Sequence, residues 1–312
     1  MSEGGVNQLV DLPTRRVEAW KYSDLRAAVG DNVQFALQRD RAAPEVGLAS
    51  QRAGIIGALA AQAGEVERLS VAEGESVARV DRPSGDGNLT PRLLDVDVAA
   101  GGSLTRVVVQ QASDAVVLDA AHVTLGAGAT FRQFVLSEGG KLARVETHVN
   151  VEGAGAHVEL NGVYLAGAGK HADLTSVITH KAPGATTRQL IKGAAAKGGR
   201  GVFQGKILVE RAAQQTDARQ YHHGMLLEAG AEVFAKPELM IHADDVQCAH
   251  GNTAGGLDAS AKFYLRSRGV PEKQARAMLI EAFLLAALLE GLPAEVDAEL
   301  RERVNVWLEA SI

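Results

Sequence analysis

The chain has 312 residues, of which 46% are hydrophobic and 22% charged, so it can bury a sizeable core as one large domain or two. Its formal net charge of −6 argues against a nucleic-acid partner, because phosphate binding requires a basic surface. The single cysteine, Cys248, excludes an intramolecular disulfide and any zinc or cluster site built from several cysteines of one chain.

No segment has the pattern of a secretion signal or a membrane span. Residues 1–14 lack a basic stretch followed by an apolar one, so we expect no signal peptide. The longest apolar stretch, Ala275–Leu292, is interrupted by Glu281 and Glu290 and falls short of the ~20 apolar residues that cross a bilayer. Together with the lone cysteine, this predicts a cytoplasmic protein without a membrane partner.

The first 70 residues predict a helical region. The segment after Pro13 is expected to form a helix that packs onto the rest of the protein through Trp20 and Tyr22. A second helix is expected over Ala53–Leu69, with a loop between the two.

Residues 71–258 change to short β-branched runs separated by glycine-rich breaks. Runs such as Arg106–Gln110 and Thr130–Val135 have the composition of strands, and neighbouring breaks are about 13 to 16 residues apart. This spacing fits an antiparallel sandwich, or a β-solenoid in which each coil buries its inward face on its neighbours. The spacing alone does not choose between them.

Residues 259–312 predict helices again, with the first ending at Gly269 and the next beginning after Pro271. The expected apolar face of that next helix consists of Met278, Leu279, Ala282, Phe283, Ala286 and Leu289. The expected face of the last helix, Ala294–Leu308, consists of Val296, Leu300, Val304 and Trp307. Such faces either cap the β region or dock a partner.

Two further patterns suggest enzymes and fail closer inspection. Gly198–Lys206 resembles a phosphate-binding loop, but Arg200 stands where that pattern needs glycine and Ile207 where it needs serine or threonine. A carbohydrate-active enzyme would need two carboxylates at a fixed separation, and Asp244 and Asp245, as neighbours on a strand, would point to opposite faces. The other acidic residues of this region are Asp217, Glu232 and Glu238.

Cys248 and His250 form the most suggestive pair. Positions two apart in an extended segment project on the same face, so a thiolate and an imidazole can reach a common iron. The alternative is that Cys248 is a small buried hydrophobe and His250 a hydrogen-bonded turn residue. His222 and His223 are expected to point opposite ways, and the scattered histidines to be structural or on the surface: His148, His157, His171 and His180.

Four segments resemble the SufB/SufD family of the SUF iron–sulfur cluster assembly scaffold, and its SufD members in particular. They are LPTRRVEAWKYSDL at residues 12–25, VFQGKILVERAAQQTDARQ at 202–220, AEVFAKPELMIHADDVQCAHGNTAGGLD at 231–258 and FYLRSRGVPEKQARAMLIEAF at 263–283. The resemblance implies a right-handed parallel β-helix over residues 71–258, flanked by helical regions at 1–70 and 259–312. It thus decides between the two β architectures.

The resemblance also implies a function: a non-catalytic scaffold subunit that pairs with a SufB-like chain and docks a SufC-like ATPase through its C-terminal helices. We expect Met278, Phe283 and Leu284 in the ATPase contact. His250 matches a residue implicated as a cluster ligand at the subunit interface, and Cys248 the cysteine of the same motif.

On this interpretation a transient iron–sulfur cluster is shared between two chains, and the isolated chain holds none. Whether a flavin binds the assembled complex stays open. The competing hypotheses are a β-helix carbohydrate-active enzyme and a purely structural homo-oligomer, the second because the solenoid end of an isolated chain can also form a homodimer.

Overall fold

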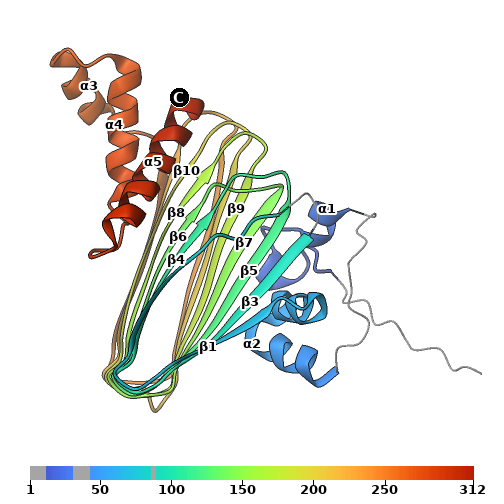
Figure 1. Ribbon diagram of the computed structural model, residues 1–312. Coiled ribbons are helices and arrows are strands. Elements are labelled where there is room, and N and C mark those ends of the chain that lie inside the picture. Colours follow the sequence, from blue (N-terminus) through green and yellow to red (C-terminus); the bar gives the residue numbers. More distant parts are fainter. Residues whose placement is uncertain (1–11, 31–42, 86–88) are drawn as a thin grey trace, which may run out of the picture.

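The computed structural model describes residues 12–30, 43–85 and 89–312. It is a mainly β solenoid with helices on its flanks, and its strands form two seven-stranded sheets that lie face to face (Figure 1). Every pairing between these strands is parallel, which confirms the solenoid and excludes the antiparallel sandwich.

Successive strands alternate between the two sheets. The odd sheet contains, in spatial order, β1 (Val66–Val71), β3 (Leu89–Val98), β5 (Val116–Leu125), β7 (Leu142–Val151), β9 (His171–His180), β11 (Arg200–Val209) and β13 (Glu232–Ile241). The even sheet contains β2 (Ser76–Asp81), β4 (Ser103–Gln110), β6 (Thr130–Ser137), β8 (His157–Ala166), β10 (Thr186–Ala195), β12 (Asp217–Leu226) and β14 (Gln247–Gly255).

The glycine-rich breaks each mark one turn between strands. One coil contains two strands, so residues in register, such as His157 and Thr186, lie 29 positions apart in the chain. Gly155 and Gly184 have φ of 70° and 71° in these turns, a conformation that glycine adopts without the cost of a Cβ clash. The spacing seen in the sequence is therefore half of one coil.

Side chains that point inward from both sheets form the core between them. Apolar residues fill its larger part, among them Val96, Val123, Phe131, Val158, Ile178 and Ile207. Because strand residues alternate between faces, a row of residues in register shares one face across a whole sheet. The same rule shows which residues of neighbouring strands lie together on the inner face.

The flanking helices cover the outer faces of the sheets. On the odd sheet lie the short 3₁₀ helix η1 (Glu18–Trp20), α1 (Leu25–Val29) and α2 (Ala43–Ala63). On the even sheet lie α4 (Glu272–Leu285) and α5 (Ala294–Ser311), whereas α3 (Ala259–Ser267) has no buried residue and projects beyond the sheet (Figure 1). The helices therefore flank the solenoid as predicted, and in the described part of the chain β1, β2, β13 and β14 each have one unpaired edge.

Three helix predictions need correction. The helix expected over Ala53–Leu69 ends at Ala63, because Gly64 takes a φ of 83° and β1 follows. The loop expected before it is partly helical, since α2 already begins at Ala43 and kinks at Gly54. The segment after Pro13 is not one helix, and residues 1–11 and 31–42 of the predicted helical region lie outside the described residues.

The apolar face predicted for α4 is the one that the structure leaves more exposed. Ile280 and Leu284 are fully buried against the even sheet, whereas Met278 is 44% exposed. Apolar residues surround most of this helix, so their spacing does not single out one face, and the position of the sheet decides it. In α5 the burial of Val296, Leu300 and Val304 is confirmed, with Leu308 in place of Trp307. None of the helices in the described part of the chain has the length and apolar character that a membrane crossing requires.

Candidate functional site

Cys248 and His250 lie on β14, the last strand of the even sheet, which pairs only with β12. Their register partners Ala218 and Gln220 are buried on the inner face of β12, so both side chains line the inner face of the final coil. Their Cα atoms are about 7 Å apart along the strand. Cys248 is half-buried and His250 is exposed, because no further coil covers them.

Among the strands that the structure describes, none pairs with the outer edge of β14. The N–H of Gln247 donates to the carbonyl oxygen of Thr216, and residues of a parallel strand alternate between the two neighbouring strands. The odd-numbered residues of β14 therefore bond to β12. The even-numbered residues, which include Cys248 and His250, direct their N–H and C=O groups to the free edge.

The thiol of Cys248 is a poor ligand while the chain is alone. Burial raises its pKa more than the backbone N–H of Ala218 lowers it, and the nearby carboxylate of Asp217 adds to the rise, so the thiol stays protonated at neutral pH. Metal binding requires the thiolate and releases the proton. Binding of a metal ion by Cys248 would therefore displace this proton.

His222 lies one strand inside the pair and is fully buried. Its ring stacks on Phe203 at 5.1 Å between centroids, its Nε2 accepts a hydrogen bond from the Tyr164 hydroxyl at 3.0 Å, and its Nδ1 lies 2.6 Å from Oδ1 of Asn252 on β14. Burial lowers its pKa to about 4, so the ring is neutral at pH 7. His222 therefore supports the end strand through Asn252, while His223 points to the opposite face.

Cys248 and His250 are the types of ligand that an iron–sulfur cluster accepts, but two ligands are too few to hold one. A thiolate and an imidazole are ligands that iron accepts, and a cubane cluster takes about four. Within residues 12–30, 43–85 and 89–312 no group of three or more histidine, cysteine, aspartate or glutamate side chains is placed to hold a metal ion. A site at Cys248 and His250 would need further donors from a second chain.

The other sequence candidates do not gather into a site. Asp244 and Asp245 lie in the bend between β13 and β14, so the argument from strand alternation does not apply to them. Glu238 pairs with Lys236, Glu232 with Arg200, and Asp217 with Arg188. Gly198–Lys206 is a turn followed by β11, as predicted. The four scattered histidines are all hydrogen-bonded within the chain: His148, His157, His171 and His180.

The predicted docking residues differ in exposure. Leu284 of α4 is fully buried against the even sheet, whereas Met278 of the same helix is exposed. Phe283 is half-buried, and the ammonium of Lys192 lies 4.6 Å from its ring. Two aromatic residues on the adjoining α3 were not among the predicted docking residues, although Phe263 and Tyr264 are 73% and 57% exposed. Their exposure depends on α3 standing away from the sheet, which no spacing along the chain reveals.

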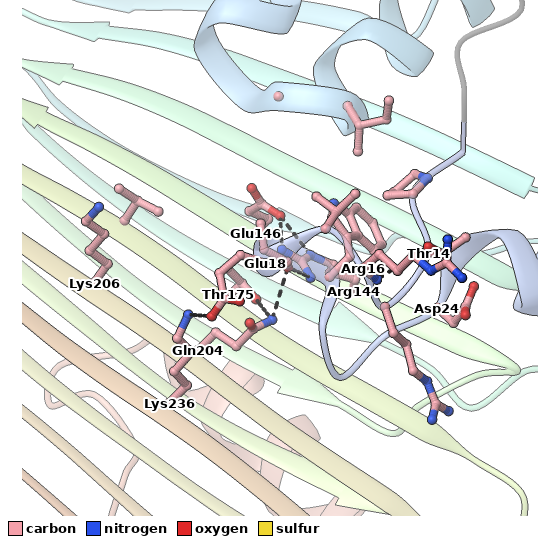
Figure 2. A pocket seen from close by; sticks show the side chains of 18 of the residues that line it. Thr14, Arg16, Glu18, Asp24, Arg144, Glu146, Thr175, Gln204, Lys206 and Lys236 are labelled. Atoms are coloured by element: carbon pink, nitrogen blue, oxygen red, sulfur yellow. Dashed lines mark hydrogen bonds and ion pairs between the residues drawn. The ribbon is translucent and has the colours of Figure 1, made fainter.

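A cavity of about 1170 Å³ lies between residues 12–26, α2 and the outer face of the odd sheet (Figure 2). The buried Arg144 on its floor donates to Glu146 at 2.7 Å and to Asp173 at 3.1 Å, and its guanidinium lies 4.1 Å from the ring of Trp20. Burial opposes ionisation of Glu146, but Arg144 outweighs it and lowers its pKa to about 2. These contacts hold the N-terminal segment on the sheet, which confirms that Trp20 packs inward.

The N-terminal segment also reaches the strand at the open end. Tyr22 stacks on Phe234 of β13 with ring centroids 5.2 Å apart, and Glu18 pairs with Lys236 of the same strand. The outer face of β13 is thus braced by the segment that Figure 2 shows in front of the sheet.

These features define a class of protein: a parallel β-solenoid whose last strand has an unpaired edge and presents a thiol and an imidazole. A family model described as the SufBD core domain of the SUF system of iron–sulfur cluster assembly matches residues 49–283. The chain belongs to the SufBD family, which confirms the resemblance drawn from its sequence.

Individual relatives agree with this assignment. A SufBD family protein of Synechocystis is 30% identical over 227 residues, which cover 72% of this chain and 50% of that protein. A SufBD family protein of Mycobacterium bovis is 30% identical over 319 residues, covering 99% of this chain and 76% of the relative. The iron–sulfur cluster assembly protein SufD of Escherichia coli is 36% identical over 170 residues, covering 53% of this chain and 40% of its own length. The chain thus spans about half the length of the first of these relatives.

Proposed function

We propose that this chain is a non-catalytic scaffold subunit of iron–sulfur cluster assembly that pairs with a SufB-like chain through the β13–β14 end of its solenoid. The observation that carries the proposal is the placement of Cys248 and His250 on a strand whose outer edge is unpaired. A partner strand added there would bring its own side chains beside them.

The two edge strands at this end differ in their readiness to pair. In β13 the N–H of Glu232 donates to the carbonyl oxygen of Gly199, directly before β11, so the even-numbered residues bond to β11. The odd-numbered residues face the free edge, and Pro237 among them has no N–H to offer. In β14 the free edge presents the N–H groups of Cys248, His250, Asn252 and Ala254 without interruption. We therefore assign the main pairing contact to β14.

The cluster is the cargo of this scaffold and would be shared between the chains. His250 would supply a neutral imidazole nitrogen and Cys248 a thiolate, and the SufB-like chain the remaining ligands. Burial raises the pKa of Cys248, so binding of iron would release the proton of its thiol. The same chain alone offers two donors and should hold no stable cluster.

The SufC-like ATPase would dock on α3 and the exposed side of α4. Phe263, Tyr264 and Met278 make this an apolar surface on elements that the sheet does not cover. Lys262 and Arg266 both pair with Glu272, which ties α3 to α4 as one unit. Leu284 supports this unit from inside, so its role is in the fold of α4 and not in the contact itself.

Growth complementation and pull-down with the His250→Ala variant test the proposal together. His250 is exposed, so alanine should cost little stability. The variant should fold, bind both partners and fail to support growth of a strain that lacks the native gene. Cys248→Ser should show a milder defect. Full complementation by His250→Ala would remove the ligand role, and loss of partner binding would make His250 a contact residue instead.

A further inference from the structure

One buried polar atom beside the open end lacks a hydrogen-bond partner among the described residues: Oε1 of Gln220. Gln220 is 0% exposed. A buried acceptor left without a donor costs about 1–3 kcal/mol, so such an atom in a native protein calls for an explanation. Gln220 lies on β12, in register with His250.

The amide of Gln220 is held in one orientation. Its Nε2 donates to Oε1 of Gln189 at 2.9 Å, and Nε2 of Gln189 lies 2.8 Å from Oγ of Ser176. Turning the Gln220 amide over would bring two acceptor oxygens together. Gly205 makes room for it, because a Cβ there would lie 2.3 Å from Nε2 of Gln220. The two ends of a carboxamide point in different directions, so Oε1 faces away from Gln189.

The neighbour on that other side is His250. Gln189, Gln220 and His250 are in register on β10, β12 and β14, and their side chains share the inner face of the even sheet. Residues in register on neighbouring strands lie about 4.8 Å apart. The ring of His250 has no hydrogen-bond partner in the described part of the chain, so an unused donor stands next to an unused acceptor.

We propose that Gln220 is a positioning residue for His250: its Oε1 accepts one ring N–H of His250 and leaves the other ring nitrogen free to bind iron. The inference rests on the proposed function, in which that second nitrogen meets a shared cluster. Rotation about the side-chain bonds of His250 closes the contact when the partner chain covers the final coil. The bond then fixes the tautomer and the ring plane, as outer acceptors do for metal-binding histidines.

The test uses the full chain assembled with the SufB-like chain of the same genome, loaded anaerobically with ferrous iron and sulfide and then reduced. Nitrogen-14 hyperfine spectroscopy detects a histidine bound to the paramagnetic cluster, and the quadrupole splitting of the remote ring nitrogen reports its hydrogen bond. Gln220→Met removes the acceptor at similar length. Gln247→Met makes the same change at an exposed position of β14 and serves as the control.

We expect a histidine signal in the wild-type complex and none in His250→Ala. Gln220→Met should keep the signal, shift the remote-nitrogen splitting and lose iron to a chelator about tenfold faster, whereas Gln247→Met should change neither. Gln220→Asn, which keeps an amide but shortens its reach, should show the same shift and replaces the methionine variant if that variant fails to fold.

Two outcomes would overturn the inference, and they differ in what else they remove. An unchanged splitting in both Gln220 variants, with the histidine signal present, refutes the contact and leaves His250 as a ligand. A wild-type cluster without any histidine signal refutes the ligand role of His250, and the positioning role of Gln220 falls with it.

Discussion

The two ends of the solenoid continue the same two sheets and are finished in opposite ways. At the β1–β2 end each strand has only six residues, and the edge carries charged side chains. Arg79 donates to both Glu67 and Asp81 there. Inside this end, the buried Arg106 lies between Asp81 and Asp119 at 2.6 and 2.7 Å. Short strands, edge charges and a paired interior are the means by which proteins prevent strand addition.

The β13–β14 end has few of these protections. Its strands are ten and nine residues long, and its inner face presents a thiol, an imidazole and an amide in place of paired ions. Met240 and Ile241 are 42% and 41% exposed on β13. On the free edge of β13, Pro237 is the residue that hinders pairing with a further strand, because it has no N–H. The β1–β2 end, or guarded end, thus has more protection against strand addition than the β13–β14 end, or open end, which agrees with the proposed pairing at β13–β14.

Proline at the free edge gives the largest expected effect, because it removes a backbone donor that only one of the two ends is proposed to use. Ala254 on β14 and Ala78 on β2 both direct their N–H to a free edge, so proline at either site keeps the internal ladder. Ala254→Pro should weaken binding of the SufB-like chain by about 3 kcal/mol, roughly 100-fold, because a partner carbonyl loses its donor. Ala78→Pro should leave the affinity unchanged.

Isothermal titration with each variant measures this difference, and thermal melting checks that both fold. Equal losses from the two prolines would mean that the β1–β2 end also pairs. No loss from Ala254→Pro would mean that the partner does not add a strand to β14.

The next largest effect separates strand pairing from ATPase docking. Phe263→Asp on α3 should lower the affinity for the SufC-like ATPase by about 2 kcal/mol, roughly 30-fold, since it places a charge in an apolar contact. It should leave both the melting temperature and the pairing with the SufB-like chain unchanged, because Phe263 is 73% exposed and not on a sheet edge.

Leu284→Ala is the matched control for α4. It removes buried volume and should cost 2–5 kcal/mol of folding free energy, following the range for large-to-small core substitutions. If Phe263→Asp melts early while its ATPase affinity is unchanged, α3 belongs to the core and the docking surface lies elsewhere.

Removing the charged side chains from the edge strand of the guarded end should allow another strand to pair there. Glu67 and Arg68 are exposed on β1, and their joint replacement by threonine leaves the net charge unchanged while giving a strand-forming edge. We expect the self-association constant to rise roughly tenfold, the size of effect that two cross-strand pairs provide. Light scattering over a concentration series measures it. The same double change at Arg301 and Glu302, exposed on α5, should have no effect.

How far the sequence predicts this molecule depends on how local each signal is. The helix end at Gly269, the turn before β11 and most of the buried stripe of α5 follow from neighbouring residues. They were predicted correctly, except that Leu308 is buried in place of Trp307. The choice of solenoid over sandwich needed the family resemblance, because both architectures show the same strands and turns. The sequence did not indicate which face of α4 the sheet covers, because apolar residues surround most of the helix.

The residues of the candidate site also differ in how far the local sequence predicts their positions. Cys248 and His250 are two residues apart, so their common face follows from strand geometry alone. Gln220 is 30 residues from His250 in the chain, and only the length of one coil brings the two into register. The exposure of Phe263 and the burial of Leu284 depend on where the helices settle on the sheet, which no local pattern encodes.

The smallest expected effect is a difference between the two ends in how stability depends on pH, because buried groups at the two ends bind protons in different pH ranges. Burial lowers the pKa of His222, near the open end, from 6.5 to about 4. Between pH 6.5 and 4, His222 is therefore protonated in the unfolded chain but neutral in the folded one. Folding stability is lost as pH falls through this range. Burial alone would raise the pKa of Asp81 at the guarded end, but Arg106 and Arg79 hold it below its ordinary 3.8. That contribution is lost only at lower pH.

Hydrogen exchange at pH 5.5 and 6.5 should therefore show β14 opening more readily at the lower pH while β2 changes less. His222 should contribute about 1 kcal/mol to the fall in unfolding free energy over this interval, so His222→Gln should flatten the profile by that amount. His242→Gln, a change at an exposed histidine, is the control and should leave the slope as it is. If His222→Gln keeps the full slope, the proton is taken up by another buried histidine. The open end is then no more sensitive to acid than the rest of the solenoid.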